Sequence, residues 1–211
     1  ATYDEVFYID WNSENHSLLY DIKKDLQLKG TASVMGQSLD VNQTIIMPGN
    51  AVSVMSMGGM AIMKQSVVGG KYSVSQQGME APITDELKES LDEAAVIIPE
   101  QTYMAKGYKL KIVGAEKVEG KDAIDMEVTT PSGKVSHRFY DATSYLLVKT
   151  AVSQEVPGQG TVTQQQYYKA YKLVNGIQIA SEEVMDMGQM KINIKYTDIK
   201  ANQGLKVTDL K

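Results

Sequence analysis

Apolar and polar residues alternate with a period of two along several stretches of this chain. The clearest are residues 39–47, 108–112, 124–129 and 190–196. One apolar face with this period is typical of an antiparallel strand that is buried on one side. Turn signals that contain glycine fall between such stretches, at residues 119–120, 132–133 and 175–176 among others. The sequence therefore predicts roughly ten to twelve antiparallel strands.

One stretch has helical spacing instead. Leu87 and Leu91 lie on one face together with residues 94, 95 and 98, Thr84 is a suitable N-cap, and Pro99 ends the pattern. These signals predict an amphipathic helix over residues 84–97. Its acidic side chains are interpreted as the solvated face of the helix: Asp85, Glu86, Glu89, Asp92 and Glu93.

The first 25 residues differ from the rest of the chain. Several aromatic residues in positions 3–11 are followed by the N-cap candidates Asn12 and Ser13, and then by leucines and an isoleucine at helical spacing. We expect an N-terminal arm with a short helix in residues 1–25 and a single domain in residues 26–211. The predicted class is mainly β: one large, curved antiparallel sheet with the helix of residues 84–97 inserted as a lid over its concave side.

Composition excludes several classes of partner. The 211 residues carry a net charge of −5, contain no cysteine, and have one arginine, Arg138. This composition argues against nucleic-acid binding, against phosphate recognition by arginine, and against disulfides. No apolar run reaches the ~18 residues of a membrane span, and the acidic, mixed N-terminus does not read as a signal peptide. If the protein is secreted, we therefore expect this sequence to be its mature form, without the signal peptide. The lack of cysteine suits the periplasm and the cytoplasm equally well.

The sequence shows no catalytic signature. His16 and His137 are the only histidines and lie far apart in the chain, and the motifs of hydrolases, nucleotide-binding loops and zinc sites are missing. A lone histidine in a strand is more often structural than catalytic. We expect no enzymatic activity, no metal site and no cofactor.

Methionine is unusually frequent, with 12 in the chain. Those in the first predicted sheet segment are Met47, Met55, Met57, Met60, Met63 and Met79. The flexible side chain and polarizable sulfur of methionine suit a surface that conforms to variable apolar ligands, but methionine also fills ordinary cores. The sequence leaves both interpretations open.

A curved sheet that its own side chains do not fill leaves a cavity. We assign the lining of this cavity from the alternation along the strands and from the apolar face of the predicted helix, which is called the helix stripe below. The candidate ligand-binding residues are Ile45, Met47, Met55, Met57, Met63, Ile124 and Met126 on the sheet, with Leu87 and Leu91 closing the cavity.

Short motifs at the predicted strands and turns follow one another in a particular order. They are LKGTA at residues 28–32, MGGM at 57–60, YKL at 108–110, VEGKDA at 118–123, PSGK at 131–134, FYDAT at 139–143, YKLVNGI at 171–177 and ANQG at 201–204. This order resembles the lipoprotein-localisation (LolA/LolB-like) family. It is most similar to divergent members described as outer-membrane lipoprotein-sorting proteins, some of which occur with insulinase-type zinc peptidases.

The resemblance implies an open, incomplete β-barrel whose mouth is covered by helices and whose apolar concave face accepts acyl chains. The chain departs from the family pattern at residues 144–146, where relatives have Thr-Gly-Leu and this chain has Ser-Tyr-Leu. No residue matches the arginine that latches the lid helix in the well-studied carriers. Arg138 lies in a predicted strand and is a poor candidate for that role.

Three functions stay open at this point. The first is a non-catalytic envelope or periplasmic protein that holds an acyl chain or another apolar ligand, with lipoprotein carriage as its more specific form. The second is an accessory protein-interaction domain associated with a zinc peptidase, or with another envelope protein, which an exposed aromatic N-terminal arm would favour. The third is an enzyme, for which the sequence gives almost no support.

Overall fold

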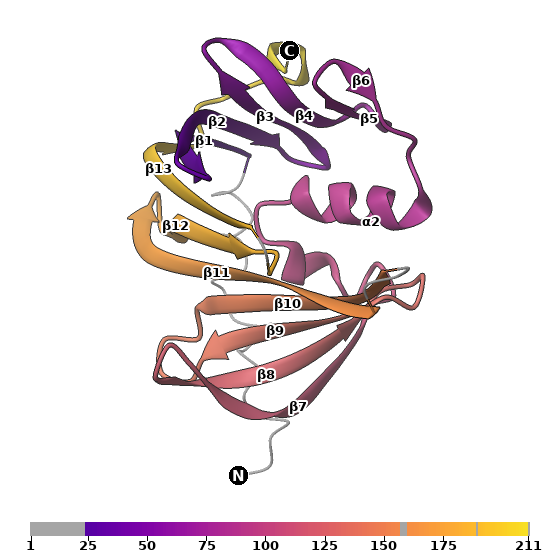
Figure 1. Ribbon diagram of the computed structural model, residues 1–211, viewed down its shortest axis with the longest axis vertical. Helices are drawn as coiled ribbons and strands as arrows, with labels where there is room; N and C mark the ends of the chain where they lie inside the picture. Colours follow the sequence, from indigo (N-terminus) through magenta and orange to yellow (C-terminus); the bar gives the residue numbers. More distant parts are fainter. Residues whose placement is uncertain (1–23, 157–159, 189, 211) are drawn as a thin grey trace.

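The fold is one antiparallel sheet with a helix inside its curve (Figure 1). The computed structural model describes residues 24–156, 160–188 and 190–210. Within them the sheet has 13 strands in the order β6-β5-β4-β3-β2-β1-β13-β12-β11-β10-β9-β8-β7. The predicted N-terminal arm and short helix lie outside the described residues.

The strands are β1 (Asp25–Val34), β2 (Gln37–Ile46), β3 (Asn50–Met57), β4 (Met60–Val68), β5 (Lys71–Gln76), β6 (Met79–Glu80), β7 (Lys109–Val118), β8 (Lys121–Thr129), β9 (Val135–Asp141), β10 (Leu147–Val156), β11 (Gly160–Val174), β12 (Ile177–Asp186) and β13 (Lys191–Ala201). Strands that are consecutive in sequence pair as hairpins within β1–β6 and within β7–β13, and the pairing of β1 with β13 joins these two halves of the sheet. Strands β6 and β7 are the two edges, so the barrel is open, which confirms the predicted fold class.

Local sequence explains the hairpins. Between β11 and β12, Asn175 and Gly176 have φ values of 48° and 79°, as a type I′ turn requires. The side-chain amide of Asn175 donates a hydrogen bond to the carbonyl oxygen of Ala201 at 2.8 Å. This turn therefore also connects the β11–β12 hairpin to the end of β13.

The predicted lid helix is α2 (Asp85–Ala94). Its N-cap is Thr84, whose Oγ1 accepts a hydrogen bond from the backbone N–H of Leu87 at 3.2 Å. The helix ends before the predicted residue 97 because the chain must turn toward Pro99, and Ile98 has the extended φ of −131° that a residue before proline favours. A 3-10 turn, η2 (Pro99–Thr102), leads on to β7, and a second one, η3 (Val207–Asp209), lies near the end of the chain.

Apolar side chains form three clusters. The main core lies between α2 and strands β1–β4 and β13, and its buried members include Leu28, Val41, Leu91 and Ile194. A second cluster contains Tyr103, Tyr108, Met126 and Val128 and lies between the η2–β7 segment and β8. A third cluster consists of Val118, Ala123 and Phe139.

A buried carboxylate fixes the C-terminal segment to the start of β1. Asp25 is 0% exposed and accepts hydrogen bonds from the backbone N–H groups of Gln203, Gly204 and Leu205 at 2.8, 2.8 and 3.0 Å. Hydrogen bonds to a charged acceptor are the strong ones.

We expect Asp25→Asn to destabilise the fold by about 2–3 kcal/mol, because the amide turns an N–H group toward backbone donors that then lack an acceptor. Urea unfolding measures this loss. Asp198→Asn is the matched control, since Asp198 pairs with Lys200 at the surface and should change stability by no more than about 0.5 kcal/mol. Equal unfolding midpoints for the two variants would contradict the role of Asp25.

Candidate ligand-binding site

The side of the sheet that faces α2 is called the inner face here. Residues directly opposite each other on antiparallel strands have their side chains on the same face. Arg138 of β9, which contacts α2, is opposite Met126 of β8 and Thr150 of β10. Continued strand by strand, the same row of the inner face comprises Gln166, Met185, Ile192 and Val34.

Five of the nine predicted lining residues meet beneath α2. Ile45 and Leu91 are each 5% exposed and belong to the main core. Met47, Met55 and Leu87 are partly buried and pack against that core. The structure thus brings the helix stripe together with residues from β2 and β3, as the helical spacing and strand alternation predicted.

The other four residues lie elsewhere. Met126 is buried in the second cluster, and Ile124, two residues before it on the inner face, is half-buried. Met63 is opposite Met55 and is half-buried. Met57 is 47% exposed next to the β3–β4 turn. The seven sheet residues of the set therefore extend from β4 to β8 and do not form one compact group with the two leucines of α2.

The methionines of the first sheet segment divide between two environments. Met47 and Met55 pack against the main core, as ordinary core methionines do. Met60 and Met79 are the first residues of β4 and β6, directly after hairpin turns, and are 72% and 70% exposed. Neither core filling nor cavity lining describes these two, because their side chains lie in solvent.

Arg138 ties the lid helix to the sheet. Its guanidinium pairs with Glu93 of α2 and lies 3.8 Å from a carboxylate oxygen of Glu100 in η2. The side chain is 9% exposed, and its Nε has no hydrogen-bond partner among the described residues. The interpretation of Arg138 as a poor latch candidate is therefore wrong, since a strand residue with an inward-facing side chain reaches the helix across the curve of the sheet.

Tyrosines surround this ion-pair cluster. The hydroxyl of Tyr103 donates to Glu93 at 2.9 Å, and the hydroxyl of Tyr140 donates to Glu100 at 3.1 Å. The Arg138 guanidinium lies 5.2 Å from the centre of the Tyr103 ring, within cation–π range. Burial raises the pKa of both tyrosines, and the nearby carboxylates raise it further. These hydroxyls therefore act as neutral hydrogen-bond donors.

Three of the five acidic residues of α2 contact the sheet and its turns, contrary to their interpretation as a solvated face, whereas Asp85 and Glu86 are exposed as that interpretation expects. Besides Glu93, Asp92 accepts a hydrogen bond from the hydroxyl of Tyr72 at 2.6 Å, which raises the pKa of Tyr72 to about 12. Glu89 accepts a hydrogen bond from the hydroxyl of Ser132 in the β8–β9 turn at 2.6 Å. The helix is thus held by polar contacts at both halves of the sheet as well as by its apolar stripe.

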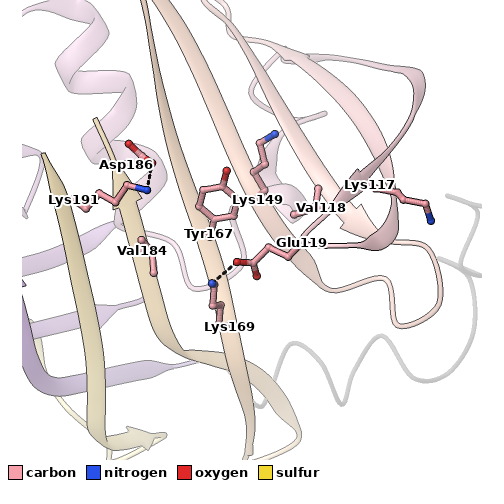
Figure 2. Close-up of a pocket in the computed structure, with 9 residues that line it drawn as sticks. All are labelled: Lys117, Val118, Glu119, Lys149, Tyr167, Lys169, Val184, Asp186 and Lys191. Atoms are coloured by element: carbon pink, nitrogen blue, oxygen red, sulfur yellow. Dashed lines mark hydrogen bonds and ion pairs between the residues drawn. The ribbon is translucent and has the colours of Figure 1, made fainter. Parts of the chain in front are cut away.

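A pocket of about 290 Å³ lies on the side of the sheet opposite α2 (Figure 2). Its lining is mostly polar, and its lysines are neutralised: Lys169 pairs with Glu119, Lys191 with Asp186 at 2.8 Å, and Lys149 with Glu116 at 2.8 Å. An anion would have to break these ion pairs, and an acyl chain would find little apolar surface. This pocket is therefore a poor site for either ligand.

The described residues include no group of three His, Cys, Asp or Glu side chains that could hold a metal ion. His137 bonds to Asp125 through Nδ1 at 2.8 Å, in a pair of partly exposed side chains. In the described part of the chain, none of the helices has the length and apolar character needed to cross a membrane.

Solved structures share this fold. A DUF1329 family protein from Desulfovibrio piger matches with a TM-score of 0.62 and 11% sequence identity over 93% of each chain. A LolA superfamily protein from Nitrosomonas europaea matches with a TM-score of 0.60 and 9% identity over 90% of each chain. No family model and no curated protein matches the sequence. The chain therefore has a LolA-like fold, as the order of its hairpin motifs predicted.

Proposed function

We propose that this chain is a non-catalytic binding protein of the periplasm or cell envelope that holds an acyl chain or a similar apolar ligand. The observation that carries the proposal is the apolar inner face of a curved, open sheet covered by one short amphipathic helix. Ligand-binding sites are concave and lined mostly by apolar side chains, and the face of the sheet beneath this single short helix has both properties (Figure 1).

The acyl chain enters between the apolar face of α2 and the sheet. Leu87 and Leu91 pack on the main core, so a ligand gains access to Ile45 and Met55 when α2 moves away from the sheet. Each methylene buried in this way contributes about 0.8 kcal/mol, so a long chain can compensate for the lost contacts of two leucines. Flexible methionines at Met47, Met55 and Met63 adapt to the ligand.

The proposed lining comprises the residues predicted from the sequence: Ile45, Met47, Met55, Met57, Met63, Leu87, Leu91, Ile124 and Met126. Arg138 is the residue that holds the lid in its closed position, through its pairing with Glu93. Carriage of lipoproteins is the more specific form of this function, and it rests on the resemblance. The alternative of a protein-interaction domain beside a zinc peptidase rests on the aromatic arm in residues 1–23, outside the described part.

Photo-crosslinking tests the proposed site. A fatty acid with a diazirine at the end of its chain should label peptides that contain Met55, Met63 or the α2 leucines, and excess oleate should suppress the labelling. Label confined to the exposed methionines Met60 and Met79, or unaffected by oleate, would count against the site.

A further inference from the structure

A carboxyl group without a cation lies on the inner face. Glu183 of β12 is opposite Tyr168 of β11 and Ile194 of β13, and Ile194 is a main-core residue, so all three side chains share the inner face. The Nε2 of Gln166 donates a hydrogen bond to Glu183 at 2.8 Å. In contrast to Arg138, which has two carboxylate partners, Glu183 forms no ion pair with any described residue.

Aromatic rings border this carboxyl group. Tyr168 is directly opposite Glu183, and Tyr196 lies two residues beyond Ile194 on β13. Burial raises the pKa of Tyr168, Tyr196 and Tyr171, and the negative charge of Glu183 raises it further, as expected for ionisable groups that lie close to one another. The electrostatic influence of Arg138 of β9 and Glu93 of α2 also reaches Tyr168, but these two residues neutralise each other.

Burial raises the pKa of Glu183 from 4.5 to about 7, and the hydrogen bond from Gln166 only partly opposes this shift. The group is therefore neutral in acid and ionised in mild base. An ionised carboxylate in partly apolar surroundings is unfavourable until a cation pairs with it. None of the described residues supplies this cation.

We propose that Glu183, Tyr168 and Tyr196 bind the ammonium head of an amphiphile whose acyl or alkyl chain occupies the inner face. The inference rests on the proposed function and specifies its ligand class. A carboxylate supplies the counter-charge, and tyrosine rings attract ammonium groups through their π faces. A sulfate or carboxylate head is repelled at the same place once Glu183 is ionised.

Three amphiphiles of equal chain length test this assignment by calorimetric titration below their micelle concentrations. They are decyltrimethylammonium, decyl sulfate and decanol, and the charges of the first two do not change with pH. From pH 6 to pH 8 the affinity for the ammonium probe should rise about tenfold, because Glu183 ionises in this range, while the affinity for the sulfate probe falls and that for decanol stays constant.

Glu183→Gln is the diagnostic variant, because glutamine imitates the neutral carboxyl group and the fold should tolerate it. It should remove the pH dependence for both charged probes while leaving decanol binding intact. Glu182→Gln is the matched control. Glu182 directly precedes Glu183, lies on the opposite face of the strand and pairs with Lys195 at 2.8 Å. Removal of its charge should therefore leave all three titrations unchanged.

The outcomes separate the two proposals. If decanol binds but the ammonium and sulfate probes bind equally at pH 8, the assignment of Glu183 is wrong and the proposed function stands. If none of the probes binds to the folded protein at either pH, both proposals are overturned. If Glu183→Gln and Glu182→Gln behave alike, Glu183 is not the head-group residue.

Discussion

Leu91→Asp is expected to lower the free energy of unfolding by about 3–5 kcal/mol, the largest effect of any single change on α2. Leu91 is 5% exposed within the main core, and none of the lysines of the described ion pairs reaches this cluster. The substitution removes a packed side chain and places an unpaired carboxylate among apolar groups. Chemical unfolding followed by circular dichroism measures the loss.

Ser90→Asp is the matched control for this substitution. Ser90 precedes Leu91 and is exposed, so the same charge stays in water and should change stability by no more than about 0.5 kcal/mol. Similar unfolding curves for the two variants would show that Leu91 is not part of a packed core. Leu91→Asp should also abolish binding of a fluorescent fatty acid under conditions where the control still binds.

Arg138→Met is expected to lower the free energy of unfolding by about 3–5 kcal/mol, because it leaves the carboxylates of Glu93 and Glu100 without their cation. Loss of this contact also releases α2 from the sheet. Hydrogen exchange should therefore accelerate in residues 85–98 more than in β1 or β13. Lys117→Met is the control, since Lys117 and Asp122 are 67% and 73% exposed and their pairing contributes little.

A double-mutant cycle isolates the ion pair from the loss of packing. We expect Arg138→Met and Glu93→Gln to show a coupling energy of about 1–3 kcal/mol, as residues in one ion-pair network do. Additive effects of the two substitutions, within about 0.5 kcal/mol, would contradict the latch. Uniform acceleration of exchange along the whole chain would indicate global destabilisation instead of lid release.

The strands and the helix were predictable from local sequence because each has a local cause. Alternation marks one face of a strand such as β8, Asn175-Gly176 allows the positive φ of its turn, and Thr84 caps α2. The order of the hairpin motifs then pointed to the LolA-like fold. Only the end of α2 was misplaced, because the extended conformation that precedes Pro99 shortens the helix from its C-terminal end.

The contacts between distant segments were not predictable in the same way. Arg138 and Glu93 are separated by 45 positions, and their meeting depends on how far the sheet curves around α2. The alternation along the strands correctly predicted apolar surroundings for Met55 and Met126, but the order of the strands places the two residues in different clusters. Arg138 is the one arginine of the chain, and this alone could have indicated the ion pair with α2. Its position in a predicted strand argued against a contact with the helix.

The orientation of the Glu183 side chain was also not predictable from the sequence. Its sequence context, Ser-Glu-Glu-Val, does not distinguish the two glutamates, yet one lies on each face of β12. Glu182 pairs with Lys195 on the outer face, whereas Glu183 is turned toward the apolar side. The register of β12 against β13, which the sequence does not specify, decides which of the two carboxyl groups faces the apolar side of the sheet.

Native mass spectrometry of the protein purified without detergent tests whether the inner face holds a lipid. We expect a species heavier than the bare chain by the mass of one lipid, and after extraction of that lipid we expect the protein to bind one equivalent of oleate or of an alkylammonium amphiphile. The Leu91→Asp variant should carry neither. A bare-chain mass alone, both after purification and after incubation of the folded protein with these amphiphiles, would contradict lipid binding.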